Sequence, residues 1–136
     1  MSRWNIEAER RFKDALEDLH VAEDLLKLSH YAASCFHSQQ AAEKALKAAL
    51  YKKGVEARGH SVYSLLLRVG QEYEEDIAYL EGYAKFLDKH YTPPRYPNLH
   101  PGIELPAHKL YVTEDAEKCL EAARTVMNFV KRLLKS

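Results

Sequence analysis

The central segment of the sequence, residues 31–53, reads YAASCFHSQQAAEKALKAALYKK. Alanine, leucine and other apolar residues cover more than one side of the helix that this segment would form, which indicates burial on several faces. Alanine has the highest helix propensity, and its small side chain lets neighbouring backbones approach closely. Gly54 follows at the position where a left-handed residue commonly ends a helix. We therefore expect this helix to be the central one of the fold.

Further helices are expected on both sides of the central one. Apolar residues recur at three- and four-residue spacing over residues 5–28, over residues 74–90 and after Thr113, as in helices with one core-facing side. Ser61 is placed to cap a short helix that ends near Gly70, and Thr113 to cap the last helix. The sequence therefore predicts an all-α fold: an antiparallel up-and-down bundle of four to five helices, the first two forming a hairpin.

Length and charge favour one globular domain. The chain has 136 residues, a common size for a single domain, so residues 1–136 are expected to form one. Twenty basic and twenty acidic residues cancel, which excludes the bulk positive field that drives non-specific binding to nucleic acids. The N-terminus lacks the pattern of a signal peptide, and no apolar run approaches the roughly 20 residues that span a bilayer. A cytoplasmic protein without membrane contact is expected.

Cysteines and histidines give no metal-binding pattern in the sequence. Cys35 and Cys119 lie in separate helical segments without a second cysteine at metal spacing, so both are interpreted as small buried hydrophobic residues. Five histidines show no HExxH pattern and have no cysteine partners; they are His20, His30, His37, His90 and His108. No metal and no cofactor are expected.

Residues 91–112 interrupt the helical pattern and contain all five prolines. Irregular segments of this length are uncommon unless they are functional or disordered. A long ordered loop before the last helix is expected, because its apolar residues can pin it to the bundle and its prolines reduce the entropy lost on fixing it. It carries Arg95 and His100. A guanidinium can bind a phosphate bidentately, and an imidazole can move a proton at a ribose hydroxyl. The other interpretation is a structural arginine that ties the loop to a carboxylate, with an exposed histidine.

Four segments, in this order, resemble the HEPN domain family. They are DLHVAEDLL at residues 18–26, SQQAAEKALKAAL at 38–50, GHSVYSLL at 59–66 and YTPPRYPN at 91–98. The resemblance implies a helical bundle, usually a homodimer, that is often encoded beside a small nucleotidyltransferase partner.

Some members of this family are metal-independent ribonucleases. In them an arginine and a histidine four to six residues later carry catalysis, and two such pairs face each other across the dimer. By this resemblance the pair is Arg95 and His100. The ribonuclease toxins commonly have a tyrosine two positions after the histidine, where this chain has Gly102. The branch with the Arg-Tyr-Pro segment is similar to proteins proposed to bind nucleotides without cutting RNA.

Five further residues are candidates for ligand binding. Lys44 and Lys47 lie on the central helix, where Glu43 and Lys47 have the spacing of a solvated ion pair; that interpretation is preferred to an anion site. His60 is expected to hydrogen-bond at a helix start or to face a ligand cleft. Tyr91 and Tyr96 could stack on a base or pack in the core. Together with Arg95 these residues form the predicted ligand-binding set.

Three functions are open at this point. The first is a HEPN-type nucleotide- or RNA-binding domain that acts with a nucleotidyltransferase-like partner. The second is a metal-independent ribonuclease toxin of a toxin–antitoxin pair, with His100 as general acid or base and Arg95 stabilising the phosphate. The third is a non-catalytic protein-interaction module.

Overall fold

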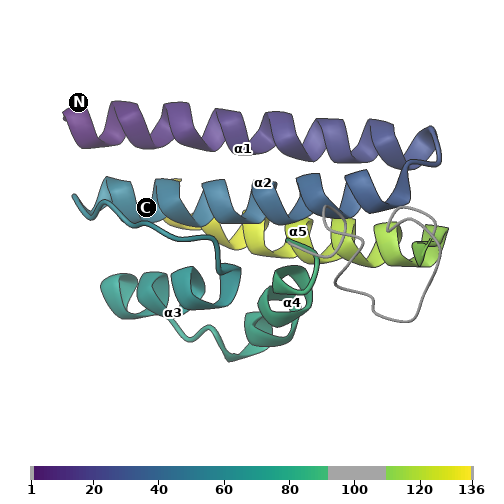
Figure 1. The fold of residues 1–136 in the computed structure, drawn as a ribbon. Helices are drawn as coiled ribbons and strands as arrows, with labels where there is room; N and C mark the ends of the chain where they lie inside the picture. The colour runs from purple at the N-terminus through teal and green to yellow at the C-terminus, as the bar shows by residue number, and fades with distance from the viewer. Residues whose placement is uncertain (1, 92–109, 136) are drawn as a thin grey trace.

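The computed structural model describes residues 2–91 and 110–135 and contains five helices in these ranges (Figure 1). They are α1 (Arg3–Lys27), α2 (Tyr31–Lys52), α3 (Val62–Tyr73), α4 (Ala78–Asp88) and α5 (Thr113–Lys135). No strand occurs in this part of the chain. The predicted all-α helical bundle is confirmed, whereas the predicted ordered loop falls mostly on residues 92–109, outside the described residues.

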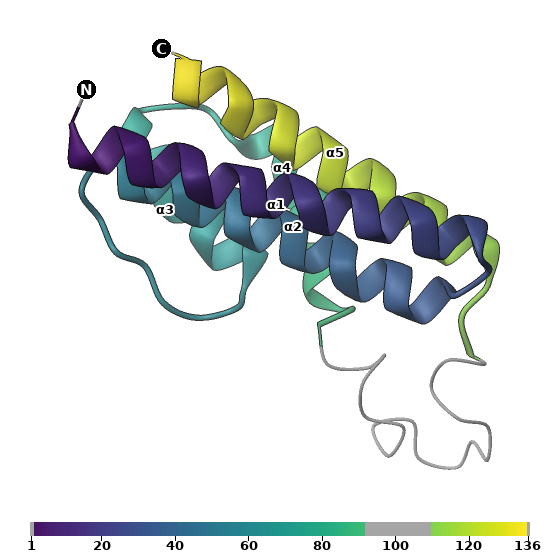
Figure 2. The same cartoon turned by 90° about the horizontal axis from the view of Figure 1, so that it is seen from above.

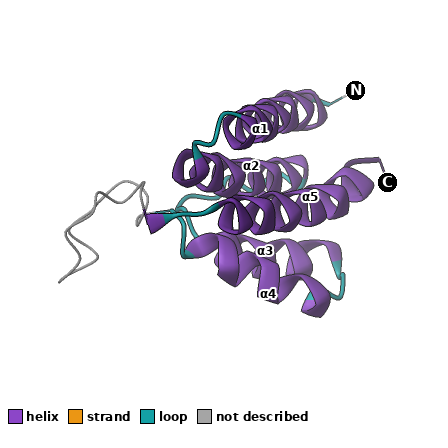
Figure 3. Ribbon diagram, turned by 90° about the vertical axis from the view of Figure 1, so that its right-hand side faces the viewer, coloured by secondary structure: helices purple, strands orange, loops and turns teal. Residues whose placement is uncertain are grey.

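The helices are arranged in three layers (Figures 1 and 3). α1 forms one outer layer, α2 and α5 lie side by side in the middle, and α3 and α4 form the other outer layer. α2 contacts all four other helices, so the predicted central helix is confirmed. Its fully buried apolar residues surround the helix axis; they are Cys35, Ala41, Ala42, Ala45, Leu46, Ala48, Ala49 and Leu50.

Helix direction follows from contacts at the helix ends. α1 and α2 form the predicted antiparallel hairpin, whose connection includes Ser29 with a positive φ of 65°. α5 runs in the same direction as α2, because Cys35 and Cys119 meet near the two starts and the Lys52 ammonium donates to the Leu134 carbonyl, 2.8 Å away, near the two ends. Both chain termini consequently lie at the same end of the bundle (Figure 2).

Two helix boundaries differ from the sequence prediction. Gly70 was expected to end α3, but the helix continues to Tyr73 and ends at Glu74, which has a positive φ of 53°. A Cβ at position 70 would lie 3.0 Å from Cγ1 of Ile77, so this glycine allows close packing instead of stopping the helix. The prediction for residues 74–90 was also wrong at its start, because α4 begins at Ala78.

Other helix ends agree with the sequence prediction or shift by one residue. Gly54 follows α2 with a positive φ of 76°, as predicted, and Ser61 caps α3 through a bond to the Ser64 amide. Thr113 is the first helical residue of α5 and not its cap. The amide of Val112 donates to the Asp115 carboxylate, 2.8 Å away. None of the described helices is both long enough and apolar enough to cross a membrane.

Candidate functional site

The predicted site residues divide into two groups. Lys44, Lys47, His60 and Tyr91 are described by the structure. Arg95, Tyr96 and His100 lie outside the described residues. The described part of the candidate site is therefore the surface around Lys44, Lys47, His60 and Tyr91.

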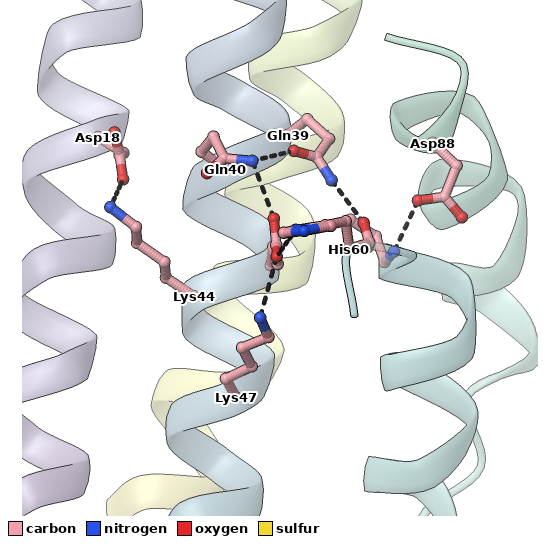
Figure 4. A network of polar contacts seen from close by, with 9 residues as sticks. Asp18, Gln39, Gln40, Lys44, Lys47, His60 and Asp88 are labelled. Atoms are coloured by element: carbon pink, nitrogen blue, oxygen red, sulfur yellow. Dashed lines mark hydrogen bonds and ion pairs between the residues drawn. The ribbon is translucent and has the colours of Figure 1, made fainter. Parts of the chain in front are cut away.

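Glu43 is the centre of a polar network on α2, and its partners Gln40, Lys47 and His60 are labelled in Figure 4. It is only 3% exposed, and its carboxylate accepts three hydrogen bonds: from Gln40 Nε2 at 2.9 Å, Lys47 Nζ at 3.0 Å and His60 Nδ1 at 2.8 Å. A buried carboxylate is costly unless such partners satisfy it. The Glu43–Lys47 pair is present as its spacing predicted, but its interpretation as a solvated pair was wrong because Glu43 is buried.

His60 is held from several directions although its side chain is 60% exposed. Its backbone carbonyl accepts a hydrogen bond from Gln39 Nε2 at 2.8 Å, and its imidazole stacks on Tyr91 with ring centroids 4.7 Å apart and planes 18° apart. An ionised Glu43 carboxylate can only accept, so Nδ1 of His60 carries the proton in this contact. The predicted hydrogen bonding of His60 at a helix start is therefore found, with Glu43 as its partner.

Asp88, the last residue of α4, is the hydrogen-bond acceptor for donors at the start of α3, beside His60. Its carboxylate accepts from the Ser61 hydroxyl at 2.8 Å and from the amides of Val62 and Tyr63 at 2.6 and 3.1 Å. These amides are consequently not free to bind a phosphate, although helix starts often do. Sequence reasoning missed Asp88, because a single carboxylate far downstream of the helix start carries no recognisable pattern.

A basic depression of about 330 Å³ borders His60 on the other side. Arg58 and Arg68 line it together with His60 and Ser64, and no acidic residue is among its lining residues. Within the described ranges no carboxylate forms an ion pair with either arginine. This local positive charge suits an anionic ligand despite the zero net charge of the chain. Sequence reasoning missed both arginines, since neither belongs to a motif.

Lys44 belongs to a different cluster from Lys47. Its ammonium lies 2.6 Å from Oδ2 of Asp18 on α1, and Nδ1 of His37 lies 3.1 Å from Oδ1 of the same carboxylate. Burial alone would raise the pKa of Asp18, but the hydrogen bonds from His37 and Lys44 outweigh it and lower that pKa below its ordinary value of 3.8. The structure thus joins Lys47, His60 and Tyr91 in one network and pairs Lys44 with Asp18.

Comparison with known proteins finds similarity over nearly the whole chain. The family model described as HEPN domain matches residues 8–133. A Methanocaldococcus jannaschii protein named "putative toxin" is 37% identical over 141 residues, which cover 98% of this chain and 93% of that protein.

Solved structures give the same result. A Thermus thermophilus protein has a TM-score of 0.87 and 37% identity, covering 93% of this chain and 97% of that one. An archaeal HEPN homologue has a TM-score of 0.78 and 36% identity, covering 98% and 99%. A HEPN domain protein from Thermotoga maritima has a TM-score of 0.73 and 31% identity, covering 93% and 98%. The chain therefore belongs to the HEPN domain family.

Proposed function

We propose that this chain is a nucleotide- or RNA-binding HEPN domain that binds phosphate and base at the surface around His60. One observation carries the proposal: Glu43 and Tyr91 fix the exposed imidazole of His60 at the edge of a depression lined by Arg58 and Arg68. Arginine guanidinium groups match phosphate geometry, and exposed flat rings are the groups on which unpaired bases stack. The free face of a fixed imidazole offers such a platform.

The predicted residues Arg95 and Tyr96 are proposed to complete this surface. Arg95 is the fourth residue after Tyr91 in the sequence, and four residues of fully extended chain span at most about 14 Å. This limit keeps the Arg95 backbone within about 14 Å of Tyr91, a distance compatible with a contact to a ligand on His60. Lys47 contributes by holding the Glu43 carboxylate that positions His60.

The proposed partners are a second copy of the chain and a small nucleotidyltransferase-like protein. The family resemblance supports both, and the similarity to a protein named "putative toxin" supports a toxin–antitoxin pair. Light scattering of the pure protein tests the dimer. Isolation of the native protein, followed by identification of what co-purifies, tests the nucleotidyltransferase; recovery of the dimer alone under gentle conditions would contradict that partner.

Binding is tested by the fluorescence anisotropy of a labelled single-stranded RNA and, separately, of a labelled adenine nucleotide. We expect His60→Ala, Arg95→Ala and the double variant Arg58→Gln/Arg68→Gln each to weaken binding. Arg124→Gln serves as the charge-matched control, because this arginine lies on α5 and pairs with Glu23. For RNA, the slope of log affinity against log salt should fall in magnitude by about 0.7 for each phosphate contact removed.

Absence of binding to both probes would overturn the proposal. It would leave the protein-interaction module as the better description, especially if Arg95→Ala changed only thermal stability. Equal weakening by Arg124→Gln would also count against a localised site.

The second candidate function is a metal-independent ribonuclease toxin. It is favoured by the similarity to the Methanocaldococcus jannaschii protein named "putative toxin". In this mechanism His100 moves the proton of the ribose 2′-hydroxyl and Arg95 stabilises the developing charge on the phosphate. Cleavage of structured and single-stranded RNA should then fall by orders of magnitude in Arg95→Ala and His100→Ala and should survive EDTA. If the native chain binds RNA but cleaves none, the binding function stands and the ribonuclease is excluded.

A further inference from the structure

Three potential metal ligands from separate parts of the sequence meet in the core at the end of the bundle where α2 and α5 begin. Cys35 lies on α2, Cys119 on α5 and His90 just after α4. The two thiol sulfurs and one ring nitrogen all lie within 4.8 Å of one another. Both cysteines are 0% exposed and His90 is 9% exposed. The expected burial of both cysteines is confirmed. Their proximity to each other and to His90 was not predicted.

The imidazole of His90 has one satisfied and one unsatisfied nitrogen. Nδ1 lies 3.0 Å from the hydroxyl oxygen of Tyr111, whereas the buried Nε2 has no hydrogen-bond partner among the described residues. Buried polar atoms are rarely left in this state, because the loss of hydration is not compensated. If the tyrosine oxygen accepts the Nδ1 proton, Nε2 presents a lone pair, as in metal sites where an outer partner fixes the tautomer of a histidine ligand.

We propose that the two sulfurs of Cys35 and Cys119 and one ring nitrogen of His90 bind one thiophilic divalent metal ion, with zinc as the best match. Two thiolates and one imidazole are a donor set typical of zinc. In a tetrahedral site with bonds of about 2.3 Å to sulfur and 2.0 Å to nitrogen, the donors are about 3.5–3.8 Å apart. The present separations of up to 4.8 Å therefore need to shorten by at most about 1.3 Å.

Charge balance supports a divalent ion. Each cysteine thiol releases its proton to solvent on binding, so two thiolates and one dication form a neutral unit with the neutral imidazole. A neutral unit needs no further counter-ion in this apolar part of the core. The metal would fasten the residue before Tyr91 to α2 and α5, next to the ring that stacks on His60.

Cobalt substitution of the full-length protein tests the site. The protein is reduced, freed of metal with a chelator and titrated with Co²⁺. We expect one Co²⁺ per chain, with thiolate-to-cobalt charge-transfer absorption and the intense visible bands of tetrahedral coordination, both removed by stoichiometric Zn²⁺. Zinc should also release about two protons per chain and raise the melting temperature, since the ion binds the folded state.

Variants assign the three ligands. Cys35→Ala, Cys119→Ala and His90→Gln should each abolish the charge-transfer band or weaken Co²⁺ binding more than 100-fold. His20→Ala, which removes an exposed histidine of α1, should change nothing. Tyr111→Phe should keep the spectrum but lower the affinity about 10- to 100-fold, because only the hydroxyl that orients His90 is lost.

Three results would overturn the proposal. The first is a native protein that shows no charge transfer and no proton release with either metal, a measurement that does not depend on whether the variants fold. The second is unchanged binding in well-folded His90→Gln, as judged by circular dichroism. The third is oxidation of the apo protein to a Cys35–Cys119 disulfide with no metal uptake by the reduced form.

Discussion

Nδ1 of His60 lies 2.8 Å from Oε1 of Glu43, and this contact joins an exposed imidazole to a carboxylate that is almost completely buried. Lys47 and Gln40 hold the same carboxylate from α2 itself, so the anchor moves only if the central helix moves. Tyr91 covers one face of the ring. His60 is consequently preorganised for a ligand although it lies in a connecting segment, and preorganisation lowers the entropy lost on binding.

The first prediction concerns this contact. Glu43→Gln should weaken RNA binding about fivefold, corresponding to roughly 1 kcal/mol, because a neutral amide oxygen replaces the charged carboxylate that anchors His60. Since both residues act through the same ring, Glu43→Gln and His60→Ala should be non-additive in a double-mutant cycle, with a coupling of about 0.5–3 kcal/mol. Anisotropy at fixed salt measures both. Lys44→Gln is the control, since Lys44 pairs with Asp18; simple additivity would refute the positioning role.

The second prediction concerns Asp88, whose carboxylate accepts two amides and one hydroxyl at the start of α3. Asp88→Ala should lower the free energy of unfolding by about 2 kcal/mol, the upper range for a helix cap. Asp76→Ala is the matched control. Among the described residues its exposed carboxylate accepts only the Ala78 amide, so a loss of about 0.5–1 kcal/mol is expected. Urea denaturation measures both, and equal losses would show that the additional contacts of Asp88 contribute nothing.

The third prediction compares two helical glycines. Gly82→Ala in α4 should stabilise the protein by about 0.5–1 kcal/mol, because a Cβ there meets no atom within 4 Å and alanine has the higher helix propensity. Gly70→Ala in α3 should instead destabilise it, because the Cβ would lie 3.0 Å from Cγ1 and 3.3 Å from Cγ2 of Ile77. Thermal unfolding of the two variants should give shifts of opposite sign. A stabilising Gly70→Ala would mean that Ile77 can move aside without loss.

The fourth prediction concerns pH. The pKa of Asp18 is lowered in the folded state, so the unfolded state binds the proton more tightly, and this group adds stability above its unfolded pKa. That stability should be lost as the pH falls below about 4 and through the lower folded pKa. Native protein and Asp18→Asn are compared by urea denaturation from neutral to acid pH. Their difference should shrink in acid; a constant difference would contradict the ionic origin.

Much of the fold was predictable because its helices have strong local signals. The apolar spacing of α1 and α5, the alanine-rich centre of α2 and the turn at Gly54 each act within a few residues along the chain. Gly70 was misread because its reason for being glycine lies in Ile77, a contact made only after the chain reverses between α3 and α4. Glu43 was misread for a related cause, since its spacing to Lys47 says nothing about how deeply the pair is buried.

The sequence alone determined the helical architecture, the central position of α2 and the family resemblance, because helix periodicity, capping and motif order are local properties of the chain. It also identified His60 and Tyr91 as candidates for the site. Only the tertiary structure decided that these two rings stack, that Glu43 anchors one of them and that Arg58 and Arg68 share its depression. The meeting of Cys35, His90 and Cys119 was decided in the same way. These contacts join residues from different elements, and their distances depend on how the helices pack and not on any spacing along the sequence.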